Sequence, residues 1–376
     1  MNNRERFHAI MNYQCYDRLP VVHFSYWTDT LDKWCAQGHI TAQERAGISD
    51  GSPEETAVSA RLGFDFNYYN TYQDLSGFSS LFPAFEEQIV EERPDGSQVV
   101  RNSDGALVIN RPDAGSIHAE VGHTLVDRKS WEEHYLPRLQ YTQTCFDDAA
   151  LKRIAEQSAN RDYPLGLYCK SLLGQVRNWL GVVNLSYLYI DDEPLFREII
   201  DTVGTLCYQV TEQVLKSGAR FDFGHFWEDI CFKNGPLIAP GVFREYAGPH
   251  YGRICGLLNA HGISIVSLDC DGWIDALIPV WLDNGVNTMF PIEVGTWGGS
   301  IGPWREKYGR VIRGVGGMDK RVFAHDYVAV DQEIERLRPL VELGGFIPCP
   351  DHRIAPDAKW ENVQYYCDRM RKVFGG

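Results

Sequence analysis

The chain has 376 residues, of which 44% are hydrophobic and 12% aromatic, and its formal net charge is −15. This much apolar and aromatic side chain argues against long disordered segments. The acidic balance argues against a nucleic-acid-binding protein, which needs a basic surface, and against attachment to anionic membranes.

The cysteine pattern and the N-terminal residues indicate in which cellular compartment the protein is expected. Ten cysteines are scattered along the chain, and no two of them form a C-x-x-C pair. A chain of this size does not need disulfides for stability, so we expect reduced thiols. Residues 1–10 carry charges and lack the apolar core of a signal peptide, and no run of 18 apolar residues occurs. The sequence therefore predicts a cytoplasmic protein with no membrane span.

Short runs rich in β-branched and aromatic residues alternate with helical patterns along most of the chain. The predicted strands, in chain order, are 21–27, 64–70, 163–169, 219–227, 263–269, 286–292, 311–317 and 345–349. The predicted helices are 192–217, 241–260, 273–284, 328–343 and 358–374. The near-continuous apolar character of the strands is typical of parallel strands buried on both faces.

The helix predicted over 192–217 has signals at both ends. Asp191 or Asp192 can cap its N-terminus, and Pro194 suits its first turn. Gly218 follows the last helical residue, where a left-handed backbone commonly ends a helix.

Residues 85–125 break the alternation. Two Asp-Gly pairs, Asp95-Gly96 and Asp104-Gly105, stand between short β-branched runs. This pattern predicts antiparallel hairpins inserted into the α/β framework. The insertion could dock a partner or cover the lower end of a barrel, and the sequence does not choose between these roles.

Eight strands alternating with helices predict a (β/α)8 TIM barrel that spans residues 1–376 as a single domain with the hairpin insertion. The alternative is an open doubly wound sheet. The barrel is favoured because no G-x-G-x-x-G turn follows the first strand and because the chain length suits a barrel.

Barrel enzymes carry their chemistry at the carboxyl ends of the strands. Asp269, Asp271, Glu293 and His352 follow three predicted strands and should meet at one mouth. Such a cluster needs a positive partner, and a divalent metal is the simplest one. Oxygen and nitrogen ligands suit zinc, manganese or iron. The alternatives are a loop-ordering role for Asp269, a helix cap for Asp271 and a hydrogen-bonded loop position for His352.

Other candidates follow neighbouring strands. Glu228 and Glu293 are candidate general acids, and either could supply a fourth metal ligand. His225 is a candidate catalytic residue or an ordinary structural histidine. Four aromatic residues at strand ends could line an apolar substrate cavity or belong to the core, namely Trp27, Tyr68, Tyr69 and Trp227.

Several segments resemble the uroporphyrinogen-decarboxylase-like superfamily. The opening NRERFHAIMNYQCYDRLPVV resembles the start of these proteins, and IVSLDCDGWIDALIPVWLDNGVNTMFPIEV resembles their fifth and sixth barrel strands. GGFIPCPDHRIAPDAKWENV resembles their last strand and last helix, and YGRVIRGVGGMDKRV also fits. The resemblance implies the barrel fold and one of two activities, decarboxylation of uroporphyrinogen or methyl transfer between a corrinoid protein and a methyl donor or thiol.

The resemblance also bears on the ligands. Methyltransferases of this superfamily usually bind zinc through a His-x-Cys-Gly segment and a cysteine ten residues before an asparagine. Here the first segment is Asp269-Cys270-Asp271-Gly272, and His352 stands ten residues before Asn362. The resemblance therefore implies a harder metal site formed by Asp269, Asp271 and His352, with zinc as the first candidate.

The arginine-rich segment of the true decarboxylases is replaced here by HFSYWTDTLDKW, which argues against a substrate with eight carboxylates. The leading hypothesis is therefore a metal-assisted methyltransferase that acts on a small-molecule substrate. No Asp-x-His-x-x-Gly segment occurs, so a corrinoid (cobalamin) would come on a separate protein. The alternatives are a carboxy-lyase and a non-catalytic binding barrel. The superfamily also suggests a homodimer.

Overall fold

The computed structural model describes residues 1–74, 81–111, 119–142, 146 and 148–375. Its central element is a parallel sheet with the strand order β15-β14-β13-β12-β9-β8-β3. The strands are β3 (Tyr72–Gln73), β8 (Gly166–Tyr168), β9 (Phe223–Trp227), β12 (Val266–Asp269), β13 (Thr288–Ile292), β14 (Arg313–Met318) and β15 (Phe346–Pro350). Parallel pairing places all their carboxyl ends at one edge, as the strand pattern predicts.

The first two predicted strands form a separate parallel pair. β1 (Val22–His23) pairs with β2 (Phe66–Asn67), and a 3-10 turn, η1 (Tyr69–Thr71), leads from β2 into β3. β1 is shorter than predicted because Ser25 adopts a left-handed backbone with φ 61°, which interrupts an extended strand. At the other edge, an isolated parallel bridge joins Tyr26 to Ile354, just after β15.

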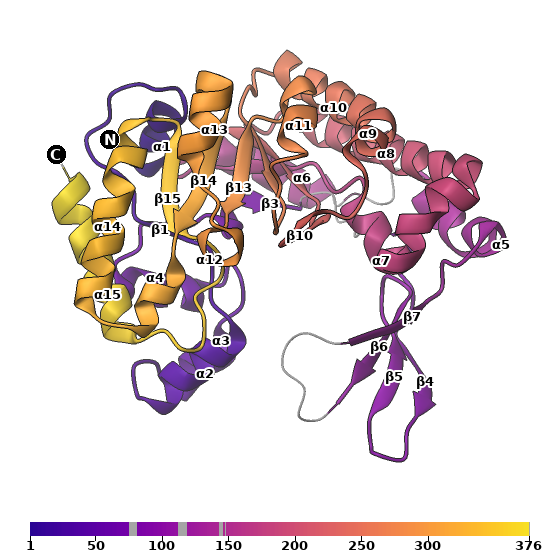
Figure 1. Cartoon of the computed structure of the whole chain (residues 1–376), viewed down its shortest axis with the longest axis horizontal. Helices are drawn as coiled ribbons and strands as arrows, with labels where there is room; N and C mark the ends of the chain where they lie inside the picture. The colour runs from indigo at the N-terminus through magenta and orange to yellow at the C-terminus, as the bar shows by residue number, and fades with distance from the viewer. Residues whose placement is uncertain (75–80, 112–118, 143–145, 147, 376) are drawn as a thin grey trace.

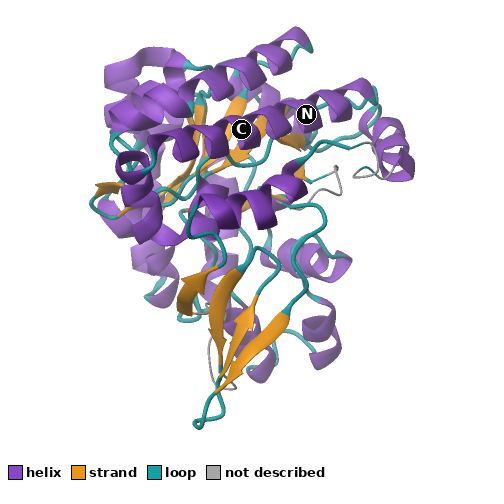
Figure 2. Cartoon of the chain, turned by 90° about the vertical axis from the view of Figure 1, so that its right-hand side faces the viewer, coloured by secondary structure: helices purple, strands orange, loops and turns teal. Residues whose placement is uncertain are grey.

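Helices surround the sheet (Figures 1 and 2). They are α1 (Asn3–Met11), α2 (Thr28–Ala36), α3 (Ala42–Gly47), α4 (Pro53–Leu62), α5 (Arg128–Ser130), α6 (Asp148–Ser158), α7 (Gly174–Asp191), α8 (Glu193–Lys216), α9 (Pro240–Tyr246), α10 (Gly248–Ala260), α11 (Ile278–Asp283), α12 (Val294–Trp297), α13 (Ile301–Tyr308), α14 (Tyr327–Glu342) and α15 (Trp360–Phe374). Among the described residues, none of the helices combines the length and the apolar character that crossing a bilayer requires.

The predicted helix boundaries are confirmed where the capping signals are strong. In α8 the Asp192 side chain accepts a hydrogen bond from the Leu195 N–H, and Gly218 beyond its end has φ 81°. The predicted helix 241–260 is instead two helices, α9 and α10, because Pro249 cannot continue the hydrogen-bond ladder of α9. The predicted helix 273–284 begins only at α11, whose first turn contains Pro279.

The predicted hairpins are confirmed as a separate antiparallel sheet. It contains β4 (Gln88–Glu92), β5 (Gln98–Arg101), β6 (Ala106–Asn110) and β7 (Ala119–His123) in sequence order. Figure 2 shows it projecting from the helix-covered body. In Figure 1 it extends on the same side as α12 and β10 (Cys231–Phe232), which follow the carboxyl ends of β13 and β9. The insertion therefore lies on the side of the strands where the candidate residues gather, and does not cover their amino-terminal ends.

Candidate active site

Three aspartates meet at the carboxyl ends of β9 and β12. Asp269 is the last residue of β12, and Asp271 follows it by two positions. Trp227 ends β9 opposite Asp269 in the strand register, which places Asp229 beside the other two. Carboxylate oxygens of Asp229, Asp269 and Asp271 all lie within 4.8 Å of one another. We refer to these three residues as the acidic triad.

The backbone holds the triad in place under strain. Asp229 adopts a left-handed conformation with φ 43°, which is unusual for a residue other than glycine and is often found at functional sites. Its Oδ1 accepts a hydrogen bond of 2.9 Å from the Asp271 N–H. The two loops after β9 and β12 are thereby fixed to each other, with their carboxylates facing one point.

Burial and the neighbouring carboxylates raise the pKa values of two members of the triad, Asp269 and Asp229. Asp269 is almost fully buried, and desolvation raises its pKa well above the usual range, with further contributions from Asp229 and Asp271. Desolvation followed by the charge of Asp271 raises the pKa of Asp229 to about 7. Three neighbouring carboxylates at neutral pH therefore require protons or a cation.

The donor set fits a divalent cation. Oδ1 of Asp271 is buried and has no hydrogen-bond partner in the described part of the chain, so it is available to a ligand. Nε2 of His352 lies 3.3 Å from Oδ2 of Asp271 and adds an imidazole donor from the loop after β15. The His352 ring stacks on Trp27 at a centroid distance of 5.4 Å, which fixes its orientation. Carboxylate oxygens and an imidazole nitrogen are ligands of the kind that hold zinc, manganese or iron.

Glu293 follows β13 on the other side of Asp271. Its Oε2 accepts a hydrogen bond of 2.6 Å from the Gly272 N–H, and its Oε1 accepts one of 2.8 Å from the Thr296 hydroxyl. Gly272 has φ 92°, and a Cβ at this position would approach the Cys231 carbonyl oxygen to 2.6 Å, so only glycine suits this turn. Desolvation and then the charge of Asp271 raise the pKa of Glu293, which keeps it protonated to higher pH.

The structure gives Glu228 a different environment from that of the triad. Its side chain is fully buried and accepts backbone N–H bonds of 2.8 Å from Leu172, 2.8 Å from Leu173 and 2.6 Å from Gly174. The Tyr251 hydroxyl donates a further, very short bond. The Ser171 hydroxyl adds a weaker bond of 3.5 Å, and these five donors surround the carboxylate and tie β9 to the start of α7, which is a structural arrangement.

We therefore expect Glu228→Gln to destabilise the protein. The amide keeps the size of the side chain but replaces one acceptor oxygen by a donor that faces a backbone N–H. Loss of such charge-assisted bonds should lower the free energy of unfolding by about 1.5–3 kcal/mol, measured by chemical denaturation. An unchanged stability would contradict the structural role.

His225 lies beneath the site in the interior of the sheet. It is fully buried, its Nδ1 is 3.1 Å from the Ser267 hydroxyl, and its ring stacks on Tyr72 at 3.5 Å between centroids. Burial lowers its pKa well below the usual value, so the ring is neutral at physiological pH. Tyr72 therefore separates His225 from the hollow described next.

An aromatic hollow of about 350 Å³ opens beside the triad. It is lined by Tyr69, Tyr72, Asp74, Tyr168, Gln175, Asn178 and Trp227. The Tyr72 hydroxyl lies 3.5 Å from Oδ2 of Asp269, so the hollow borders the triad directly. Two of the predicted substrate-binding residues, Tyr69 and Trp227, belong to this lining.

The other two predicted substrate-binding residues lie elsewhere. Tyr68 is fully buried, packs on Phe223 and Phe290, and donates a hydrogen bond of 3.1 Å to the Ser267 hydroxyl. Trp27 stacks on His352 and so acts on the orientation of that ring. The structure thus brings Asp269 and Asp271 together with Asp229, places His352 beside Asp271, and ties Glu293 to the neighbouring Gly272.

Sequence reasoning did not select Asp229, Tyr72 or Lys320. Asp229 stands two residues beyond the end of β9, just as Asp271 stands two residues beyond the end of β12, and this parallel spacing was the available signal. Tyr72 lies on a strand that the pattern 64–70 did not include. Lys320 follows β14, and burial lowers its pKa while Asp351, Glu293 and Asp271 oppose that shift. Its amine therefore belongs to the electrostatic surroundings of the site.

No family model matches the sequence, and no curated protein matches it. A methyltransferase from Methanosarcina mazei superposes over 99% of both chains with a TM-score of 0.61 at 14% sequence identity. A structure described as a candidate vitamin-B12 independent methionine synthase from Listeria monocytogenes matches 60% of this chain and 70% of its own length, with 13% identity and a TM-score of 0.36. The first likeness shows a shared fold, and the second is too weak for any inference.

Proposed function

We propose that the protein is a metal-assisted methyltransferase whose metal is held by the acidic triad and His352. The observation that carries the proposal is the group of three carboxylates within 4.8 Å of one another, with the His352 imidazole 3.3 Å from Asp271. Among the described residues, Oδ1 of Asp271 has no hydrogen-bond partner. The shared fold with a methyltransferase over the full chain favours methyl transfer among the reactions that such a site can support. Zinc is the first candidate metal, with manganese and iron as alternatives suited to the same ligands.

The proposal extends to the family and the partner. We infer that β1 and β2 complete the parallel sheet to a closed (β/α)8 barrel, supported by the Tyr26–Ile354 bridge next to β15. We also assign the chain to the uroporphyrinogen-decarboxylase-like superfamily, in its corrinoid-dependent branch, on the segments quoted above. The corrinoid would be carried by a separate protein that delivers its cobalt to the mouth of the sheet.

The residues of the chain have distinct roles in this reaction. A bound divalent metal would supply Lewis acidity to the oxygen or nitrogen from which the methyl group departs. Tyr69, Tyr72 and Trp227 pack against the substrate and exclude water from the reacting bond. The departing atom keeps the electron pair of the broken bond to carbon, and Glu293, with its raised pKa, provides the proton that this atom takes up.

The proposal is tested with free cobalamin as the methyl acceptor. Purified protein, loaded with zinc, manganese or iron, is incubated with cob(I)alamin under anaerobic conditions and with aryl methyl ethers or methylated amines. We expect metal-dependent formation of methylcobalamin, followed by its absorption spectrum and abolished by a chelator. Turnover that survives complete metal removal, or release of carbon dioxide in place of methyl transfer, would overturn the proposal and favour a carboxy-lyase.

A further inference from the structure

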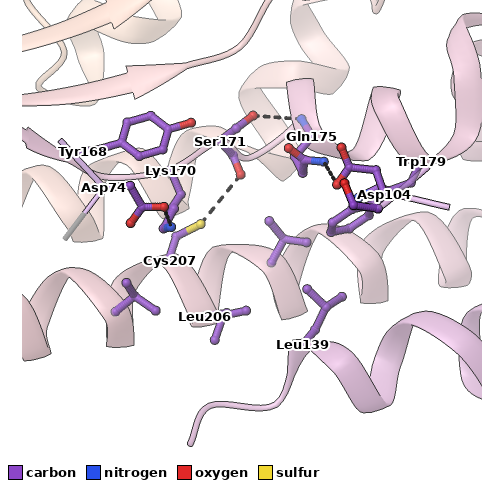
Figure 3. Close-up of a pocket in the computed structure, with 13 residues that line it drawn as sticks. Asp74, Asp104, Leu139, Tyr168, Lys170, Ser171, Gln175, Trp179, Leu206 and Cys207 are labelled. Carbon is purple, nitrogen blue, oxygen red and sulfur yellow. Dashed lines mark hydrogen bonds and ion pairs between the residues drawn. The ribbon is translucent and has the colours of Figure 1, made fainter. Parts of the chain in front are cut away.

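A second cavity adjoins the aromatic hollow. It has a volume of about 210 Å³ and is lined by residues of α7 and α8 and by Ser103 and Asp104 of the inserted sheet. Figure 3 shows the side chains that line it. It shares Asp74, Tyr168 and Gln175 with the lining of the hollow, so the two spaces adjoin. We refer to it as the inner cavity.

The inner cavity contains an excess of negative charge. Its charged side chains are Asp74, Asp104 and Lys170, and Lys170 forms a very short ion pair with Asp74 (Figure 3). Oδ1 of Asp104 accepts a hydrogen bond of 3.2 Å from the Gln175 amide. Within residues 1–74, 81–111, 119–142, 146 and 148–375, no lysine, arginine or histidine lies within ion-pair distance of Asp104. Of the two carboxylates in the inner cavity, Asp104 is therefore the one without a cationic partner among the described residues.

Asp104 is held in position by the turn between β5 and β6. Oδ1 of Asn102 accepts hydrogen bonds from the backbone N–H groups of Asp104 and Ala106, at 3.1 and 2.9 Å. The Tyr135 hydroxyl donates a 3.0 Å bond to the Asp104 carbonyl oxygen. Gly105 has φ 84°, and a Cβ there would collide with the Tyr135 hydroxyl. This fixed turn presents the carboxylate to α7, where burial raises its pKa. A nearby cation would stabilise the ionised form of this buried carboxylate.

Aromatic and aliphatic side chains form the rest of the wall. The rings of Tyr168 and the fully buried Trp179 face the cavity, and Leu139, Leu206 and Val210 supply an apolar floor. The Trp179 indole nitrogen lies near Asp104, but no acceptor from the described part of the chain forms a hydrogen bond with its N–H. An aromatic face beside a carboxylate favours an organic cation, because the negative face of the ring attracts positive charge.

Lys170 marks the boundary between the inner cavity and the hollow. It lies two residues after β8 and has a left-handed backbone conformation with φ 71°. This conformation is strained for residues other than glycine and is often found at functional sites. The Lys170 ammonium group forms an ion pair with Asp74, so an anionic ligand would have to displace that carboxylate. Such a ligand would also be repelled by Asp104. A cationic ligand meets neither obstacle.

We propose that the inner cavity binds the ammonium end of an elongated, partly apolar substrate, with Asp104 as its charge partner. The inserted sheet thereby contributes a substrate-binding residue. The assignment of the reacting end of the same molecule to the hollow beside the triad rests on the proposed function, whereas the binding of an organic ammonium in the cavity does not.

The test uses three ligands of similar shape and different charge, namely benzylammonium, benzyl alcohol and benzoate. Their affinities for metal-depleted protein are measured by isothermal titration calorimetry. We expect benzylammonium to bind at least about tenfold more tightly than benzyl alcohol, and benzoate to bind least. Asp104→Asn should remove the preference. Asp95→Asn, at the other Asp-Gly turn of the same sheet, should retain it, and Asp104→Glu should retain part of it.

Three results would overturn the proposal. The first is that wild-type protein binds the three ligands with equal affinity. The second is that a folded Asp104→Asn variant still prefers benzylammonium as strongly as wild type. The third is that wild type prefers benzoate and that Lys170→Gln removes this preference. Because no metal or methyl donor is present, this outcome is separate from the proposed reaction. A cation preference without methyl transfer supports the inner cavity alone, and methyl transfer without a cation preference refutes only the inner cavity.

Discussion

Replacing Asp269 by asparagine is expected to abolish metal-dependent turnover and at the same time to stabilise the metal-free protein. Asp269 is buried beside two other carboxylates, and among the described residues its side chain has only a long 3.5 Å hydrogen bond from Tyr72. The neutral amide removes the repulsion and loses little bonding. We expect the free energy of unfolding to rise by about 0.5–2 kcal/mol, the range common for stabilising substitutions. Metal affinity should fall by more than the roughly 10–100-fold that loss of an outer-shell partner costs.

The measurement combines chemical denaturation of metal-depleted protein with the cobalamin assay on metal-loaded protein. Glu228→Gln is the matched control, because Glu228 is also a buried carboxylate at the end of β9 but has five donors around it. The two substitutions should change stability in opposite directions. A destabilised Asp269→Asn variant would show that this carboxylate has a structural role instead.

Asp222→Ala is expected to lower the free energy of unfolding more than Glu228→Gln does. The Asp222 side chain is 1% exposed and pairs at 2.5 Å with Nη2 of Arg161, which is equally buried. Arg4 and His8 also contact it, at 2.8 and 2.7 Å. Removing one partner leaves a buried guanidinium uncompensated, which costs about 3–5 kcal/mol. Chemical denaturation measures this loss, and Asp17→Ala, at a solvent-exposed ion pair, should lower the free energy of unfolding far less. Equal losses in both variants would contradict the account.

The same carboxylate predicts a pH dependence. Burial alone would raise the pKa of Asp222, but hydrogen bonds from His8, Arg4 and the Leu165 N–H outweigh burial and lower it to about 2 from 3.8. A carboxyl group with a lowered pKa stabilises the fold above its unfolded value, and this contribution is lost as the pH falls. The stability difference between wild type and Asp222→Asn should therefore narrow from about pH 5 to pH 3. A constant difference would contradict this role.

The sequence was informative where a local rule acts. Hydrophobic runs located the strands of the main sheet, the Asp-Gly pairs located the hairpins, and Asp192 with Gly218 located the ends of α8. It was less informative where non-local contacts decide. The short β1, interrupted at Ser25, and the break between α9 and α10 depend on how the chain packs around these points.

The candidate site shows the same division. Strand ends predicted the neighbourhood of Asp269, Asp271 and His352, because parallel strands bring their carboxyl ends to one edge. The separation of Glu228 from the triad was not predictable, since it depends on the backbone N–H groups of residues 172–174, more than fifty positions away. The contribution of Asp104 to the inner cavity likewise depends on how the inserted sheet packs against α7.

The metal content of the purified protein is the most direct test of the central claim. Elemental mass spectrometry would compare wild type with Asp271→Asn and with Asp283→Asn, an exposed aspartate outside the site. We predict about one divalent metal ion per chain in wild type and in Asp283→Asn, and less than about a tenth of that in Asp271→Asn. Absence of metal from wild type after supplementation, or full retention in Asp271→Asn, would contradict the account.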